Sequence, residues 1–195
     1  WSPESVLEPV DPVVSITLRN RTVQIRAWKY SVHGQQSDSV PVYLLDTDLP
    51  GNDPADREIT DHLYGGGSEH RLVQEAVLGF GGIAALQAIG YTNISVYHMN
   101  EGHSAFLTLG LLEQKLREAG EGVSESAAVP SHVVNSVRSS CVFTTHTPVP
   151  AGHDKFPRWL VANVLGNERV KLLDRVGALR DGSLNMTFLA LFFSH

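Results

Sequence analysis

Two polar stretches that follow apolar runs constrain the fold of this chain more than any other feature. Residues 97–103 follow a predicted buried strand at residues 94–97, and residues 144–154 follow another at residues 141–143. Each stretch leads into a helical pattern, as in a parallel α/β sheet. Because consecutive parallel strands end at the same edge, where ligands bind, we expect the two stretches to meet and to carry the function. They hold four of the nine histidines.

The first part of the chain, about residues 12–46, is predicted to be rich in β-strands. Apolar residues alternate with others at residues 14–18 and 23–27, on either side of a polar turn, which predicts a hairpin. Residues 40–45 predict a third strand. The fold class is therefore α/β with a hairpin-rich start.

The second part, about residues 54–195, is predicted to alternate between helices and strands. The expected helices begin at the following places: Pro54, capped by Asp53 and running to about Leu63; Ser68 as the N-cap, running to near Gly90; residue 104, running to 119; Ser131, running to Arg138; Pro157, followed by a second helix from about Val170; and Asn185. Gly79, Gly81 and Gly82 lie inside the second helix, where each costs about 1 kcal/mol relative to alanine. We therefore expect close packing against another backbone there.

Composition excludes several classes of protein. The net charge of −6 lacks the basic footprint of a nucleic-acid binder. A single cysteine, Cys141, excludes an internal disulfide framework, fits a reducing cytoplasm and is expected to be a buried, inert thiol. No stretch approaches the roughly 18 apolar residues that cross a bilayer, so no membrane partner is expected. The 195 residues begin at Trp1 and stop within an apolar run, so we expect a fragment of a longer protein.

The polar stretches offer several kinds of site. Asn100, Glu101 and the neighbouring histidines could bind oxyanions or sugar hydroxyls beside helix N–H groups, or they could be an Asn cap with solvated neighbours. In the second stretch, Pro148 and Pro150 stiffen the loop that carries His146, which suits either a ligand contact or a plain loop. Both interpretations stay open on the residues alone.

Other chemistries are weaker. A zinc site could draw its ligands from His98, Glu101, His103, His146 and His153. However, the His-Glu-x-x-His order is missing, so no metal site is predicted. There is no Gly-x-Ser-x-Gly elbow for a nucleophile, and no P-loop lysine follows residues 65–67. The three glycines are better explained as a hinge or gate loop.

Residues 98–106 and 144–157 closely resemble the α-glucan (glycogen) phosphorylases of the bacterial and archaeal branch. Supporting stretches in the same order are residues 43–48, 63–66, 71–75 and 185–187. The resemblance implies an internal part of the N-terminal, Rossmann-like domain of a two-domain (GT-B type) retaining glycosyltransferase. The complete protein would transfer a terminal α-1,4-linked glucose of glycogen, starch or maltodextrin to inorganic phosphate, giving glucose 1-phosphate. The family allows a homodimer and uses pyridoxal 5′-phosphate, held by a lysine of a C-terminal domain outside this chain.

The resemblance also implies residue roles. His146 matches the histidine that binds the glucose 6-hydroxyl, and it is the expected catalytic residue. The other expected sugar-pocket residues are Asn100, Glu101, His103 and Thr147, and the expected gate or supporting residues are Tyr64, Gly65, Gly66, Arg71 and Glu75. Because the cofactor domain and a glycine-rich loop are missing, the isolated chain is expected to be inactive. The alternatives are a fragment of a nucleotide-sugar-dependent glucan synthase and a non-catalytic carbohydrate-binding remnant.

Overall fold

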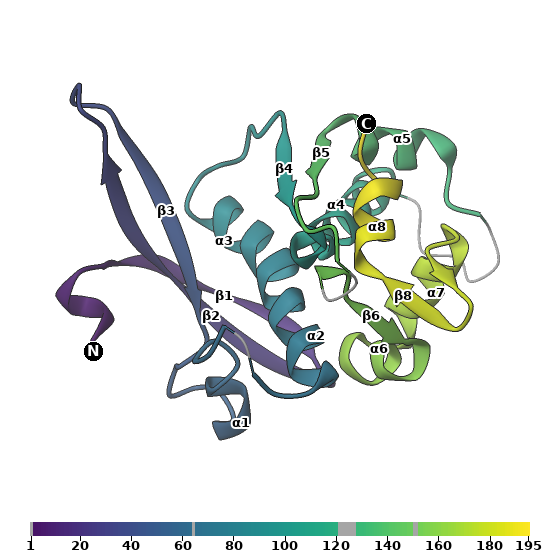
Figure 1. The fold of residues 1–195 in the computed structure, drawn as a ribbon, viewed down its shortest axis with the longest axis horizontal. Helices are drawn as coiled ribbons and strands as arrows, with labels where there is room; N and C mark the ends of the chain where they lie inside the picture. The colour runs from purple at the N-terminus through teal and green to yellow at the C-terminus, as the bar shows by residue number, and fades with distance from the viewer. Residues whose placement is uncertain (1, 64, 121–127, 150–151) are drawn as a thin grey trace.

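The computed structural model describes residues 2–63, 65–120, 128–149 and 152–195. Small sheets are separated and covered by helices, with the N-terminal sheet at one end and the C-terminal helices at the other (Figure 1). The strands are β1 (Glu8–Leu18), β2 (Arg21–His33), β3 (Ser39–Asp46), β4 (Tyr97–Asn100), β5 (Cys141–Thr144), β6 (Lys155–Pro157), β7 (Leu179–Arg180) and β8 (Ser183–Asn185). The helices are α1 (Pro54–Arg57), α2 (Ser68–Ala76), α3 (Gly82–Ala88), α4 (Phe106–Glu118), α5 (Ser131–Ser139), α6 (Arg158–Leu165), α7 (Asn167–Arg175) and α8 (Met186–Phe192), with shorter or irregular turns η1 (Pro3–Ser5), η2 (Val77–Gly81) and η3 (Gly102–Ser104).

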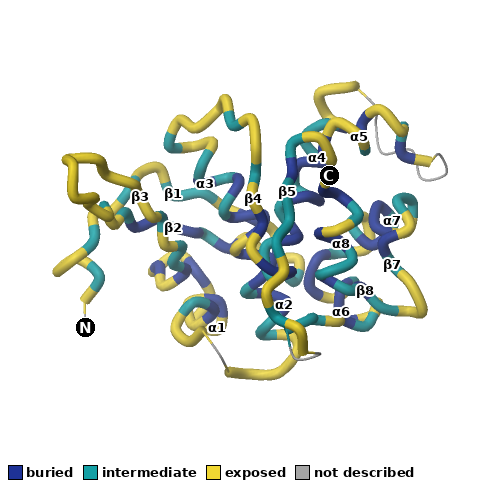
Figure 2. Tube along the Cα trace, turned by 45° about the horizontal axis from the view of Figure 1, so that its top comes forward, coloured by how far each residue is buried: buried dark blue, intermediate teal, exposed yellow. Residues whose placement is uncertain are grey.

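The predicted hairpin and third strand are confirmed as an antiparallel sheet in the order β1-β2-β3. Arg19 and Asn20 form the tight turn with φ values of 53° and 56°, the backbone that a two-residue hairpin loop requires. Ile16, Val23 and Ile25 are buried on the face that packs against α3 and η2. The far ends of β2 and β3 project from the body and are exposed (Figure 2).

The predicted glycine-containing helix exists, but it is interrupted. The chain winds as α2, the π-helical segment η2 and then α3. A Cβ at Gly79 would lie 2.7 Å from the backbone nitrogen of Leu107, and one at Gly81 would lie 2.5 Å from the Ile25 side chain. Close packing against another backbone is thus confirmed for Gly79. Gly81 packs closely against a side chain instead, and the prediction is wrong for Gly82, which has no neighbour within 4 Å.

Three predicted helix boundaries were wrong. Asp53 does cap α1, accepting a hydrogen bond from the Ala55 N–H, but the helix ends at Arg57 rather than near Leu63. The chain beyond it is turned toward α2, where the Gln74 side-chain amide donates to the carbonyls of Ile59 and His62.

At α2, Gly67 is the N-cap and Ser68 is the first helical residue. The helix predicted from residue 104 is preceded by η3 and begins at Phe106.

The two strands that carry the polar stretches are parallel neighbours, as predicted. Tyr97 pairs with Cys141 and Asn100 with Thr144. The first strand lies three residues later than expected: residues 94–96 precede β4, and Val96 is 52% exposed. The strand begins at Tyr97 because that residue meets the first residue of β5. His98 therefore lies within the strand instead of after it. Cys141 is fully buried, and burial raises the pKa of its thiol to about 11, in agreement with an inert role.

The C-terminal part contains a sheet that the sequence analysis missed. Strands β6, β8 and β7 pair antiparallel in that order. The predicted final helix is confirmed as α8, whose N-cap Asn185 accepts from the Phe188 N–H. Helix α4 lies in the shared core, with Phe106, Leu109 and Leu112 fully buried.

The fold class is α/β, built from small sheets. Within the described residues the parallel sheet has two strands, so the finer assignment to a two-domain glycosyltransferase stays a prediction. None of the described helices is long and apolar enough to cross a membrane.

Candidate functional site

An open pocket of about 630 Å³ lies beside the ends of β4 and β5. It brings together segments that are far apart in the sequence. Its lining residues are Leu63, Gly65, Gly66, Gly67, Ser68, Arg71, His103, Thr147, Val149, Gly152, Asp154, Lys155 and Phe156. The glycine run predicted as a gate thus shares one cavity with a residue from each polar stretch, His103 and Thr147.

The carboxylate of Glu101 holds the loop that follows β5. Its Oε1 accepts from the N–H of His146, from the N–H of Thr147 at 2.9 Å and from the Thr147 hydroxyl at 3.0 Å. Its Oε2 accepts from the Thr145 hydroxyl at 3.1 Å. We call these four residues the Glu101 clamp. The clamp joins the two polar stretches through hydrogen bonds instead of leaving both free for a ligand.

The clamp sets the ionisation of Glu101. The hydrogen bond from the His146 N–H, together with those from Thr147 and Thr145, lowers the pKa of the carboxyl from 4.5 to about 2. Donors that point at a carboxylate favour its charged form. Glu101 is therefore an anion throughout the neutral range, although only 8% of it is exposed.

The backbone at Glu101 is strained. Its φ of 64° and ψ of 169° lie in a region used almost only by glycine, at a cost on the order of 1–3 kcal/mol. The next residue, Gly102, is pressed against α8, because a Cβ there would lie 2.9 Å from the Thr187 nitrogen. The Glu101 N–H donates to the Thr144 carbonyl at 2.9 Å. These contacts hold the strained residue in place.

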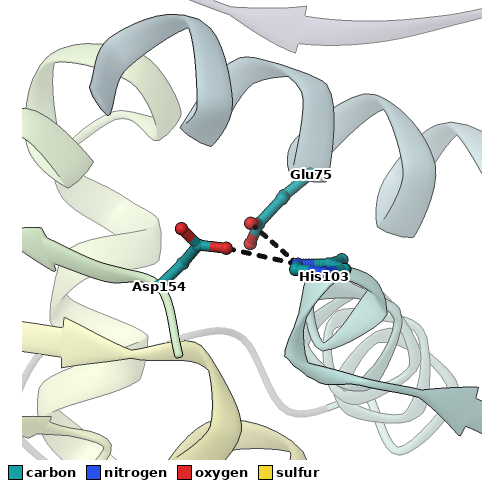
Figure 3. Close-up of side chains that lie close together, drawn as sticks. All are labelled: Glu75, His103 and Asp154. Carbon is teal, nitrogen blue, oxygen red and sulfur yellow. Dashed lines mark ion pairs between the residues drawn. The ribbon is translucent and has the colours of Figure 1, made fainter. Parts of the chain in front are cut away.

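A second cluster of charged groups lies at the wall of the pocket (Figure 3). Glu75 from α2 and Asp154 from the segment before β6 both point at His103 of η3, at 3.5 Å and 3.2 Å from its Nδ1. The Arg71 Nε lies 3.2 Å from Glu75 and 3.3 Å from Asp154, and its Nη2 lies 2.6 Å from the His103 Nδ1. We call these four residues the Glu75 cluster. Opposite charges from three segments thus meet beside the pocket.

The two acids of the Glu75 cluster titrate in opposite directions. Glu75 is 2% exposed, and burial raises its pKa from 4.5 to about 8. The hydrogen bond from His103 lowers the pKa of Asp154 below its usual range. The same bond, with help from Glu75, raises the pKa of His103 from 6.5 to about 9. At pH 7 the cluster therefore holds a neutral Glu75, an anionic Asp154 and a cationic His103.

Three potential metal ligands of the Glu75 cluster lie close together, with the Arg71 guanidinium among them. Ligand atoms of Glu75, His103 and Asp154 lie within 4.8 Å of one another. The Arg71 guanidinium already lies between the carboxylates. Arg71 and His103 supply the positive charge that an ion would bring.

The zinc set weighed from the sequence is not assembled either. The Glu101 oxygens are engaged by the loop, and His103 belongs to the Glu75 cluster. His98 Nε2 lies 2.7 Å from the Thr144 hydroxyl, and His153 Nδ1 lies 2.8 Å from the Thr187 hydroxyl. These groups face different partners.

The structure distributes the predicted site residues over neighbouring positions. Gly65, Gly66, Arg71, His103 and Thr147 line the pocket. Glu75 lies behind it and lines an adjoining pocket of about 360 Å³.

Three further predicted residues lie around this pocket. Glu101 lies under the loop, whereas Asn100 and His146 are exposed at the ends of the two strands. Tyr64 lies outside the described residues.

Sequence reasoning missed two groups. Asp154 was part of a recognised stretch but was given no role, and its partner Arg71 is 83 residues away. Thr145 was also passed over, although its hydroxyl donates to Glu101. Only the position of both residues within the second polar stretch pointed to them.

No family model matches the chain. Among curated proteins, the glycogen phosphorylase of Mycobacterium tuberculosis (strain H37Rv) is 41% identical over 167 residues, which cover 82% of this chain and 18% of that protein. The maltodextrin phosphorylase of Thermococcus litoralis is 41% identical over 145 residues, 74% of this chain and 16% of that protein. The glycogen phosphorylase of Aquifex aeolicus is 30% identical over 142 residues, which cover 73% of this chain and 18% of that protein. The chain therefore belongs to an α-glucan phosphorylase-related family and matches less than a fifth of the length of its larger relatives.

Proposed function

We propose that this chain is part of the N-terminal catalytic domain of an α-glucan phosphorylase and forms one wall of its glucose pocket. The complete protein would transfer a terminal α-1,4-linked glucose to inorganic phosphate, giving glucose 1-phosphate and a shortened glucan. Similarity to glycogen and maltodextrin phosphorylases supports this proposal. The observation that carries it is the pocket where His103 and Thr147 meet the glycine run, with His146 on the adjoining loop.

The proposed roles follow from position. The exposed His146 side chain would donate to the glucose 6-hydroxyl, while Glu101 binds its backbone N–H. Asn100, Thr147 and His103 would contact or border the sugar. Gly65 and Gly66, with a φ of 69° at Gly66, would let the gate segment approach the sugar closely. Arg71 and Glu75 would support the gate from α2. Such a wall would act by orienting the sugar and by placing dipoles near the developing positive charge.

Pyridoxal phosphate is implied by the family, and the lysines of this chain do not fit it. A Schiff-base lysine needs a desolvated pocket, whereas none of the four lysines is buried. Lys29, Lys115 and Lys171 form ion pairs with carboxylates that are themselves largely exposed, and Lys155 is exposed at the start of β6. We propose that the chain without its larger context has no phosphorolytic activity.

The test uses the complete protein that contains this segment, with maltoheptaose and phosphate as substrates. His146→Ala should lower kcat/KM by about 10²-fold or more, a loss of about 2.7 kcal/mol of transition-state stabilisation. His132→Ala, a matched change at an exposed position of α5, should leave kcat/KM within about twofold. Unchanged phosphorolysis in His146→Ala would refute the role of this histidine.

The same assay separates the alternatives. Glucosyl transfer from a nucleotide sugar without phosphorolysis would identify a glucan synthase. Maltoheptaose binding with neither activity would identify a carbohydrate-binding remnant.

A further inference from the structure

We propose that Glu101 is a positioning residue, which holds residues 145–147 so that the His146 side chain faces the sugar, and that its carboxylate does not itself bind the glucan. This inference rests on the proposed function and changes the role that the family resemblance gives to Glu101. Four observations carry it.

First, the loop uses the carboxylate. Oε1 accepts three hydrogen bonds and Oε2 accepts one, all from residues 145–147. An ionised carboxylate has about four acceptor sites. At Oε1, a sugar hydroxyl would have to replace a donor that already belongs to the protein, and that replacement would release part of the loop.

Second, the hydrogen bonds to Glu101 include the backbone of His146, the proposed catalytic residue. Two of the four donors are the consecutive backbone N–H groups of His146 and Thr147. Holding both amides at one oxygen sets the direction of the peptide between them. Because the His146 Cα is part of this backbone, Glu101 determines where the imidazole starts.

Third, the backbone conformation of Glu101 directs its side chain toward the loop, and this conformation carries a strain that glycine would avoid. With φ at 64° and ψ at 169°, glycine would be the unstrained choice. The next residue, Gly102, packs against Met186 and Thr187 of α8 and so fixes the backbone at this point. The strain of a non-glycine residue at this position is therefore offset by what its side chain does, and that side chain contacts the loop.

Fourth, the loop is confined on its other side. A Cβ at Gly152 would lie 2.3 Å from the Thr147 Cγ2, so the Thr147 side chain lies between Gly152 and Glu101. The Gly152 N–H donates to the Val149 carbonyl at 3.0 Å. Glu101 and Gly152 thus confine the loop from two sides and leave the His146 side chain exposed.

The test is a double-mutant cycle between Glu101 and His146 in the complete protein, measured as kcat/KM for phosphorolysis of maltoheptaose. Glu101→Ala should lower kcat/KM by about 10²-fold, and the pair Glu101→Ala with His146→Ala should be no more than about threefold below His146→Ala alone. Two separate ligands to the sugar would instead multiply their effects to about 10⁴-fold, and that outcome would overturn the inference.

Two matched variants separate positioning from folding. Glu101→Gln keeps an oxygen for the loop amides, and its NH2 group can donate to the Thr145 hydroxyl, which donates to the carboxylate in the wild type, so activity should return to within about tenfold of wild type. Glu101→Gly removes the side chain and relieves the backbone strain. It should therefore be as inactive as Glu101→Ala but unfold at a higher temperature than Glu101→Ala. Full activity in Glu101→Gly would contradict the inference.

A readout that does not depend on turnover keeps this inference distinct from the proposed function. Amide hydrogen exchange of His146 and Thr147, measured without substrate, should accelerate in Glu101→Ala and stay near wild type in Glu101→Gln. Unchanged exchange in Glu101→Ala would show that Glu101 does not hold the loop. Accelerated exchange together with no effect of His146→Ala on activity would uphold the clamp and reject the proposed function.

Discussion

Two buried glutamates near this pocket have opposite ionisation. Glu101 receives four hydrogen bonds from a loop, and its pKa is lowered to about 2. Glu75 is buried on a helix face among groups that are themselves charged, and its pKa is raised to about 8. The two residues are almost equally inaccessible, at 8% and 2% exposure. Burial alone therefore does not decide the charge of a carboxyl group.

At Glu75 burial has the largest effect on the pKa, whereas at Glu101 the hydrogen bonds outweigh burial. Backbone N–H groups and hydroxyls aimed at Glu101 are fixed dipoles, and they favour the anion without any charge to share. Arg71 and His103 also serve Asp154, which is 22% exposed at its side chain and keeps its charge at lower cost. In the Glu75 cluster the negative charge thus lies on Asp154, the better solvated acid. In the Glu101 clamp it lies on the buried Glu101 itself.

The largest effect on stability should come from the acid that carries the charge of the Glu75 cluster. Asp154→Asn leaves Arg71 and a cationic His103 without that anion, and should lower the free energy of unfolding by about 2 kcal/mol. The measurement is urea unfolding at pH 7.

Asp174→Asn is the matched control, because its ion pair with Arg158 is exposed on both sides and should be worth less than about 1 kcal/mol. Equal losses in the two variants would show that the Glu75 cluster contributes no more than a surface pair.

The next effect is a stability that depends on pH in opposite ways for the two sites. Folded Glu75 keeps between pH 4.5 and about 8 a proton that the unfolded chain loses, and folded His103 does the same between 6.5 and about 9. Raising the pH through these windows therefore favours unfolding. Folded Glu101 loses its proton at a lower pH than the unfolded chain does, so its contribution disappears as the pH falls from 4.5 toward 2.

Thermal unfolding from pH 3 to 9 measures this dependence. We expect greatest stability near pH 5, with the alkaline decline flattened in Glu75→Gln and the acid decline flattened in Glu101→Gln. An alkaline decline that is unchanged in Glu75→Gln would mean that the folded glutamate is ionised.

The smallest effect should be Glu75→Gln itself at pH 4.5. Glutamine has the shape of the protonated acid, and at this pH much of the unfolded chain also keeps the Glu75 proton, so the free energy of unfolding should change by less than about 1 kcal/mol. Glu101→Gln should lose more, because the clamp binds an anion. Urea unfolding of the two variants compares the sites directly, and a larger loss at Glu75 would show that Glu75 is the anion that the fold stabilises more strongly.

Much of the local structure could be predicted from the sequence. Alternating apolar residues predicted the antiparallel hairpin, and Asp53 and Asn185 predicted the starts of α1 and α8. The glycines predicted a close approach to another backbone, which the structure shows at Gly79 against α4. Strands β6, β7 and β8 were missed because two or three residues are too few for a period to show. The first residue of β4 was misplaced because its partner strand decides where pairing begins.

For the candidate site, the sequence indicated the two stretches and their meeting at one edge, and the parallel pairing of β4 with β5 agrees. It could not indicate that Glu101 would turn toward the loop 45 residues later, or that Asp154 would meet Arg71 across 83 residues. Spacing along the chain carries no information about such pairs, because they depend on how separate helices and strands pack.

The sequence by itself determined which groups are available: two glutamates, a set of histidines and a glycine run, each next to a recognisable strand or helix end. The tertiary structure decided what these groups are. It made Glu101 an anion by aiming four donors at it, and it made Glu75 neutral by burying it beside a better solvated acid. The reason is physical, because a pKa depends on the dipoles and charges within a few ångströms, and folding brings those neighbours from distant parts of the chain.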